Sequence, residues 1–149
     1  MDYKRTQAQL TAPPLQREAA QLHCYVVFTT PRQSVAALRE ADALARGLHA
    51  RITVLAAYEV PFHLPLHRPP VSIQFTEERL AEWVRQGGVA ASVRVYLCRD
   101  TCEAIRHALP PASLVVIEGR KRWWPSRAQK LTRLLEHDGH RVVLVEDFQ

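Results

Sequence analysis

Five short apolar runs, rich in Val, Ile and Leu, constrain the fold of this chain more than any other feature of its sequence. The first and fourth runs are apolar throughout, which is typical of strands buried on both faces of a parallel sheet. Segments with helical spacing or with turn residues separate the runs, so the pattern predicts strands and helices in alternation. The predicted strands are residues 24–28, 51–58, 92–97, 114–117 and 142–145.

The segments between the predicted strands carry helix signals. Apolar residues recur every three or four positions in residues 35–48, and Thr76 is expected to cap a helix over residues 77–85. Asp100 and Glu103 fit a capping box. Because a strand, a helix and a parallel strand connect by a right-handed crossover, we predict an α/β fold: a doubly wound, five-stranded parallel sheet with helices on both faces.

Length and composition favour one compact domain. The 149 residues are 47% apolar, and no shift in composition marks a second domain. Residues 1–22 are polar and interrupted by Pro13 and Pro14, so we expect a partly disordered tail there and the domain over residues 23–149. No run of about 18 apolar residues is present that could span a membrane. Three cysteines, an odd number, favour a reducing compartment, and we expect a cytoplasmic protein.

Two loops are expected at the carboxyl edge of the sheet, where ligands bind in this class of fold. One is residues 29–34 and the other is residues 119–126. Cations in and after the second loop could hold a phosphate beside the start of a helix. Alternatively, they are solvated charges on an exposed loop, and Trp123 and Trp124 form a lid or a partner surface. Glu118 is expected to neutralise this charge. The cations are Arg120, Lys121, Arg122, Arg127 and Lys130.

Several features of the chain are similar to the universal stress protein family. They are the order and lengths of the predicted elements, the phrase SVAALREADALAR at residues 34–46, and the closing strand, glycine loop, helix and strand. The resemblance covers residues 23–146. It implies the strand order 3-2-1-4-5, frequent homodimers and, in one subgroup, ATP binding.

The ATP-binding subgroup of that family has an aspartate near the end of the first strand and a Gly-x2-Gly-x9-Gly-(Ser/Thr) loop after the fourth. In this sequence Thr29 stands at the aspartate position, and Gly119 matches the first glycine. The second glycine falls on Arg122, and the final pair falls on Ala128 and Gln129. Because side chains at these positions obstruct the approach of backbone N–H groups to phosphate, we expect no bound cofactor and weak or absent ATP binding.

These observations predict a non-enzymatic universal-stress-like domain, a dimeric interaction or regulatory module with an altered nucleotide site. The alternative is a small-ligand sensor that binds an adenine nucleotide or another anion through the cationic loop. Nucleic acid is less favoured, because a net charge of +5 is moderate and the paired tryptophans are one short stacking patch. The candidate nucleotide- or anion-binding residues are Thr29, Thr30, Ala57, Gly119, Arg120, Arg122, Ser126, Arg127, Ala128 and Gln129.

No catalytic or metal-binding motif is intact in the sequence. His63 with His67 and Cys98 with Cys102 could meet as zinc ligands, although neither spacing is the tight kind typical of zinc sites. Cys102, in a predicted first helical turn, is a candidate nucleophile. His140 is expected at the surface or at a helix end, since it follows the end of a predicted helix. We therefore expect neither an enzyme nor a metal site.

Two segments bear on assembly and accessibility. The last predicted strand, from Arg141 to Val145, is apolar and lies at a sheet edge in the implied order. Because an unpaired apolar edge needs a cover, we expect a homodimer through this strand. Residues 59–74 hold four prolines and are expected to cross the carboxyl edge of the sheet as an irregular segment that proteases cut early.

Overall fold

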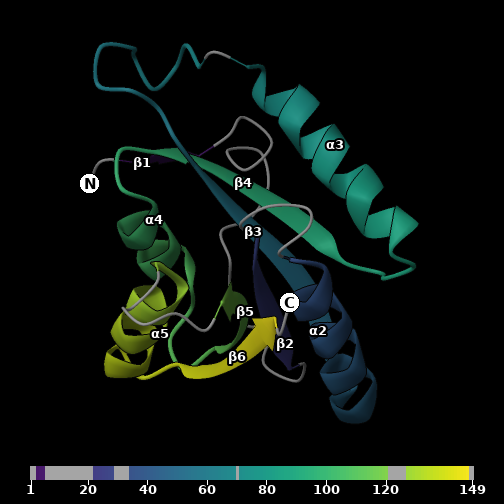
Figure 1. The fold of residues 1–149 in the computed structure, drawn as a ribbon. Coiled ribbons are helices and arrows are strands. Elements are labelled where there is room, and N and C mark those ends of the chain that lie inside the picture. The colour runs from purple at the N-terminus through teal and green to yellow at the C-terminus, as the bar shows by residue number, and fades with distance from the viewer. Residues whose placement is uncertain (1–2, 6–21, 29–33, 70, 121–126, 148–149) are drawn as a thin grey trace.

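The computed structural model describes residues 3–5, 22–28, 34–69, 71–120 and 127–147 of the chain. It consists of three layers, with one sheet between two pairs of helices (Figure 1). The strands are β1 (Tyr3–Arg5), β2 (His23–Phe28), β3 (Arg51–Glu59), β4 (Ser92–Cys98), β5 (Leu114–Arg120) and β6 (Arg141–Asp147). The helices are α2 (Val35–Leu48), α3 (Ile73–Gln86), α4 (Thr101–Ala108) and α5 (Arg127–His137).

The sheet has the strand order β1-β4-β3-β2-β5-β6. Strands β2 to β6 are parallel, so the five strands expected from the sequence lie in the order 3-2-1-4-5, and the fold class is confirmed. Strand β1 adds a short antiparallel edge, with Tyr3 opposite Cys98 and Arg5 opposite Tyr96. This strand falls within the expected tail, because three residues without an apolar run give no strand signal. Residues 1–2 and 6–21 lie outside the described part of the chain.

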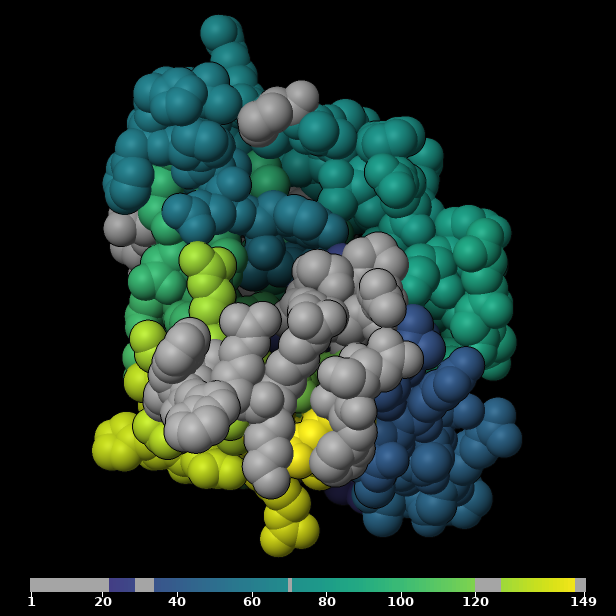
Figure 2. Space-filling view, in the orientation of Figure 1, coloured from purple at the N-terminus to yellow at the C-terminus, as the bar shows by residue number. Residues whose placement is uncertain are grey.

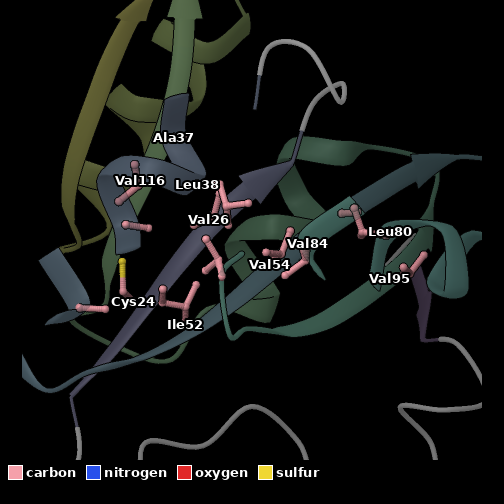
Figure 3. Close-up of a cluster of buried hydrophobic side chains, with 14 residues drawn as sticks. Cys24, Val26, Ala37, Leu38, Ile52, Val54, Leu80, Val84, Val95 and Val116 are labelled. Atoms are coloured by element: carbon pink, nitrogen blue, oxygen red, sulfur yellow. The ribbon is translucent and has the colours of Figure 1, made fainter. Parts of the chain in front are cut away.

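Each face of the sheet packs against its own pair of helices. Cys24 and Val26 of β2 point into a cluster with Leu38 of α2, which α3 also covers (Figure 3). Tyr25 and Val27 point the other way, into a cluster with residues of α4 and α5. Both sets of side chains are buried, so neither face of β2 meets water. This explains why the run is apolar at every position instead of alternating.

Helix α3 begins earlier than the sequence predicts, so Thr76 is not its cap. The helix starts at Ile73, and the hydroxyl of Ser72 accepts a bond from the Phe75 N–H at 3.5 Å. Thr76 lies inside the first turn and donates its hydroxyl to the carbonyl of Ser72. Asp100 caps helix α4 as predicted, since it accepts a bond from the Glu103 N–H at 3.2 Å. The Glu103 carboxylate bonds to Arg106.

His140 follows the end of α5, which agrees with a place near a helix end, but it is buried and does not lie at the surface. It is 8% exposed, and its ring Nδ1 accepts a hydrogen bond from the backbone N–H of Ser113 at 3.1 Å. The next residue, Arg141, donates its own N–H to the Ser113 carbonyl. His140 therefore links the start of β6 to the start of β5 by a hydrogen bond. Burial lowers the pKa of His140, and the nearby Asp138 carboxylate raises it by a smaller amount.

We expect His140 to make the fold sensitive to mild acid. Its neutral form is favoured in the folded state, so its contribution is present above the ordinary pKa of 6.5 and is lost as the pH falls through the lower folded value. Protonation removes the acceptor for the Ser113 N–H, and the loss of this hydrogen bond lowers the free energy of unfolding by about 0.5–1.5 kcal/mol. Urea denaturation at pH 7 and pH 5 should show a smaller pH effect for His140→Asn, whose amide oxygen can accept the same bond. An equal pH effect in both proteins would contradict this assignment.

Candidate functional site

The carboxyl edge of the sheet is where the topology places a ligand. Parallel strands with helical crossovers bring the ends of β2, β3 and β5 and the starts of α2, α4 and α5 to this one edge. From β2 the chain continues to β3 on one side, and from β5 it continues to β6 on the other. The strand order therefore reverses between β2 and β5, which is the position where ligands bind in open α/β sheets.

Part of the predicted site is brought together on the α4 and α5 face of this edge. Ala57 of β3 and Ala128 of α5 pack against the same buried cluster. Gly119 is half-buried near the end of β5, Arg127 is exposed at the start of α5, and Gln129 is half-buried in its first turn. For Arg120 the structure describes only its position as the last residue of β5. The other predicted residues, Thr29, Thr30, Arg122 and Ser126, lie outside the described residues, as do Lys121, Trp123 and Trp124.

Glu118 lies on the opposite face of β5 and bonds to a helix start. Its carboxylate Oε2 accepts hydrogen bonds from the backbone N–H groups of Ala36 at 3.1 Å and Ala37 at 3.4 Å. The side chain is 5% exposed. Ser34, the N-cap residue of α2, makes no side-chain cap bond, and the first turn of α2 has no acidic residue. Glu118 therefore supplies the negative cap that the helix lacks in its own sequence.

Comparison with solved structures agrees with this architecture. A universal stress protein family structure from Burkholderia pseudomallei superposes with a TM-score of 0.56 at 20% identity, covering 87% of this chain and 98% of that one. A universal stress protein from Archaeoglobus fulgidus gives a TM-score of 0.54 at 14% identity, covering 83% and 93%. The chain has the universal stress protein fold. No protein-family model matches the sequence, and no curated protein matches it significantly.

Within this universal stress protein fold, the sequence gives little sign that Glu118 is a helix cap. It is separated from Ala36 by 82 positions, so no local motif joins the two. Two signals were nevertheless in the sequence: an acid at the end of a buried strand, and a helix without an acid in its first turn. Parallel strands place such an acid beside the start of a neighbouring helix.

Cys102 adjoins the predicted site, but its environment disfavours a nucleophilic thiolate. It is half-buried and packs against the same cluster as Ala57 and Ala128. Burial raises its pKa, the Asp100 carboxylate raises it further, and Arg127 lowers it. The thiol is therefore protonated at neutral pH, which argues against the nucleophile considered from the sequence.

In the described residues, neither a cluster of possible metal ligands nor a helix that could span a membrane is present. No group of three or more His, Cys, Asp or Glu side chains lies close enough together to hold a metal ion in the part of the chain that the structure describes. His63 and His67 are exposed, whereas Cys98 is buried and its thiol donates to the Tyr58 carbonyl at 3.5 Å. Among the described helices, none is long and apolar enough to cross a membrane.

The proline-rich insertion is held in place by Arg99. Its guanidinium donates to three backbone carbonyls, those of Val60 at 2.8 Å, Pro61 at 2.6 Å and Leu64 at 2.8 Å. It also lies over the ring of Phe62 at 5.3 Å. The middle of the expected irregular segment is therefore a set of turns anchored to the residue that follows β4. Its ends are regular, because Glu59 belongs to β3 and Ile73 and Gln74 belong to α3. The role of Arg99 was not predicted from the sequence, because every residue has a backbone carbonyl and no pattern of side chains marks the ones that accept.

Proposed function

We propose that this chain is a non-enzymatic, dimeric regulatory module with the universal stress protein fold, in which the nucleotide site no longer holds ATP. The observation that carries the proposal is the buried carboxylate of Glu118 at the start of α2. Backbone N–H groups at a helix start attract anionic ligands, but here two of them already bind a carboxylate of the chain itself.

The start of α5 supports the same proposal. Ala128 and Gln129 stand where the ATP-binding pattern has a glycine followed by Ser or Thr. Ala128 is half-buried and packs toward the core, so a side chain occupies this position instead of open backbone. The protein as purified should therefore carry no adenine nucleotide. Its absorbance ratio, and mass spectrometry after denaturation, test this directly, and a stoichiometric adenine nucleotide would contradict the proposal.

One observation favours the alternative, a sensor for a small anion. Helix α5 has no acidic residue in its first turn, and the exposed cations Arg127 and Lys130 lie at this positive end of the helix. A single small anion there would relieve the repulsion without the glycine loop that ATP requires. Stabilisation of the fold by millimolar inorganic phosphate, but not by ATP, would favour this second function.

The dimer is proposed through the outer edge of β6. Strand β4 is covered by β1, but among the described residues no strand pairs with the outer edge of β6. The residues from Arg141 to Val145 form most of this strand, and Val142 to Val145 are half-buried. A two-fold partner strand would satisfy both exposed edges at once.

Light scattering at micromolar concentration should give twice the mass of the 17.0 kDa chain. Val143→Lys should yield a monomer, but Val143 packs against the core, so a thermal melt must show that the variant is folded. Hydrogen exchange on the wild-type protein is the second measurement. A dimer should protect the β6 amides that point away from β5. A wild-type monomer with rapid exchange at these amides would refute the edge dimer.

A further inference from the structure

The two outer edges of the sheet differ. Strand β6 has no strand on its outer side among the described residues, and part of it, in yellow, reaches the surface (Figure 2). At the other edge the short strand β1 lies along β4, with Tyr3 opposite Cys98 and Arg5 opposite Tyr96 (Figure 1). The strand pairs from β4 to β6 are parallel, whereas β1 is antiparallel. Strand β1 is therefore an addition to one edge of the five-stranded fold and not a member of its repeating strand-and-helix pattern.

Strand β1 covers the most buried part of β4. The covered residues Tyr96, Leu97 and Cys98 are 1%, 5% and 0% exposed. The uncovered part of β4 includes the exposed Ser92 and the half-buried Arg94. Charged side chains on an edge strand disfavour pairing with another chain, so Arg94 gives the uncovered part some protection of its own. The covered part has no charged residue, and there β1 provides the protection.

The direction of β1 indicates which partner it excludes. A two-fold axis perpendicular to a sheet places an edge strand antiparallel to its copy in a second molecule. Strand β1 also runs antiparallel to β4, so it occupies the position and the direction that β4 of a second copy would take. Every copy presents the same edge, and two-fold homodimers are the commonest soluble assemblies. A second copy of this chain is therefore the partner that β1 excludes.

We propose that β1 is a detachable guard of the β4 edge, and that its release lets β4 pair with β4 of a second copy. The strand is three residues long and lies next to the N-terminus, where segments open at little cost in free energy. It can leave without disturbing the crossovers between β2 and β6, because it precedes them in the chain. Anything that binds or removes residues 3–5 would then change the size of the assembly. This edge lies opposite β6, so the guard role does not depend on the proposed dimer.

The test uses the full-length protein with Lys4→Pro and Arg5→Pro together. Backbone N–H groups of neighbouring residues in a strand point to opposite sides, so one of the two replacements removes the donor that faces β4. We expect light scattering at micromolar concentration to give roughly twice the mass of the wild-type protein, or more. The matched control, Ala8→Pro with Gln9→Pro, places two prolines outside β1 and should keep the wild-type mass. Circular dichroism checks that both variants fold.

A synthetic peptide of residues 1–8 locates the contact. In excess, the peptide should pair with the opened β4 edge and return the double-proline variant to the wild-type mass. The same peptide with proline at positions 4 and 5 should leave the larger assembly intact. Hydrogen exchange gives an independent readout, because the outward amides of residues 96–98 should exchange rapidly in the dilute variant and slowly in the assembled one.

Two results would overturn the proposal. One is a folded double-proline variant with the wild-type mass, and the other is a larger assembly that the peptide of residues 1–8 does not disperse. A wild-type protein that is a monomer would remove the β6 dimer alone, because the variant is compared with the wild type in either case. A wild-type dimer whose mass the two prolines leave unchanged would remove the guard alone.

Discussion

Replacing Glu118 with alanine should lower the free energy of unfolding by about 2–4 kcal/mol. The change leaves the N–H groups of Ala36 and Ala37 without the carboxylate that accepts from them, in a place where Glu118 is 5% exposed and water cannot easily substitute. It also removes the negative charge from the positive end of α2. Urea denaturation gives the free energy, and hydrogen exchange at these two amides locates the loss.

Two controls define what the Glu118 result means. Glu118→Gln keeps an oxygen acceptor for the same amides and should recover part of the loss. Asp100→Ala removes an exposed, local N-cap from α4 and should cost about 1 kcal/mol. A loss for Glu118→Ala no larger than that for Asp100→Ala would show that the buried carboxylate is not the main cap of α2.

Replacing Arg99 with alanine should open the insertion to proteases. Arg99 donates to the carbonyls of Val60, Pro61 and Leu64, and its loss frees all three at once. Hydrogen bonds from a charged donor contribute about 1.5–3 kcal/mol each when buried and less when half-exposed. We therefore expect cleavage within residues 60–69 to be about tenfold to a hundredfold faster, because proteolysis follows the population of the open segment.

The matched control for Arg99 is Arg68→Ala, which removes an exposed arginine from the same insertion. Its cleavage rate should equal that of the wild type. If the two variants were cut at the same rate, the Arg99 contacts would not be what orders this segment.

The fold was predictable because it depends on pattern. Continuous apolar runs and helical spacing are local properties, and they identify the five parallel strands and the helices between them. The structure differs from the prediction where one or two residues determine the start or the presence of an element. Ser72 begins α3 ahead of Thr76, since both can serve a helix start and only the chain path selects between them. Strand β1 has three residues and depends on β4 for its pairing.

The candidate site was less predictable because its contacts are distant in sequence. The parallel topology brings Ala57, Gly119 and Ala128 to the expected edge. The cap that Glu118 provides for α2, and the bond between His140 and Ser113, join residues 82 and 27 positions apart. No repeating pattern in the sequence marks such pairs. They become visible only when the folded chain places a buried polar group beside its partner.

The most direct test of the central claim is calorimetric titration of the purified protein with Mg-ATP. Because Glu118 occupies the start of α2 and Ala128 fills the position of a glycine at α5, we expect a dissociation constant above about 100 μM, or no measurable heat. This corresponds to a binding free energy of roughly 5.5 kcal/mol or less in magnitude. A stoichiometric site with micromolar affinity would contradict it.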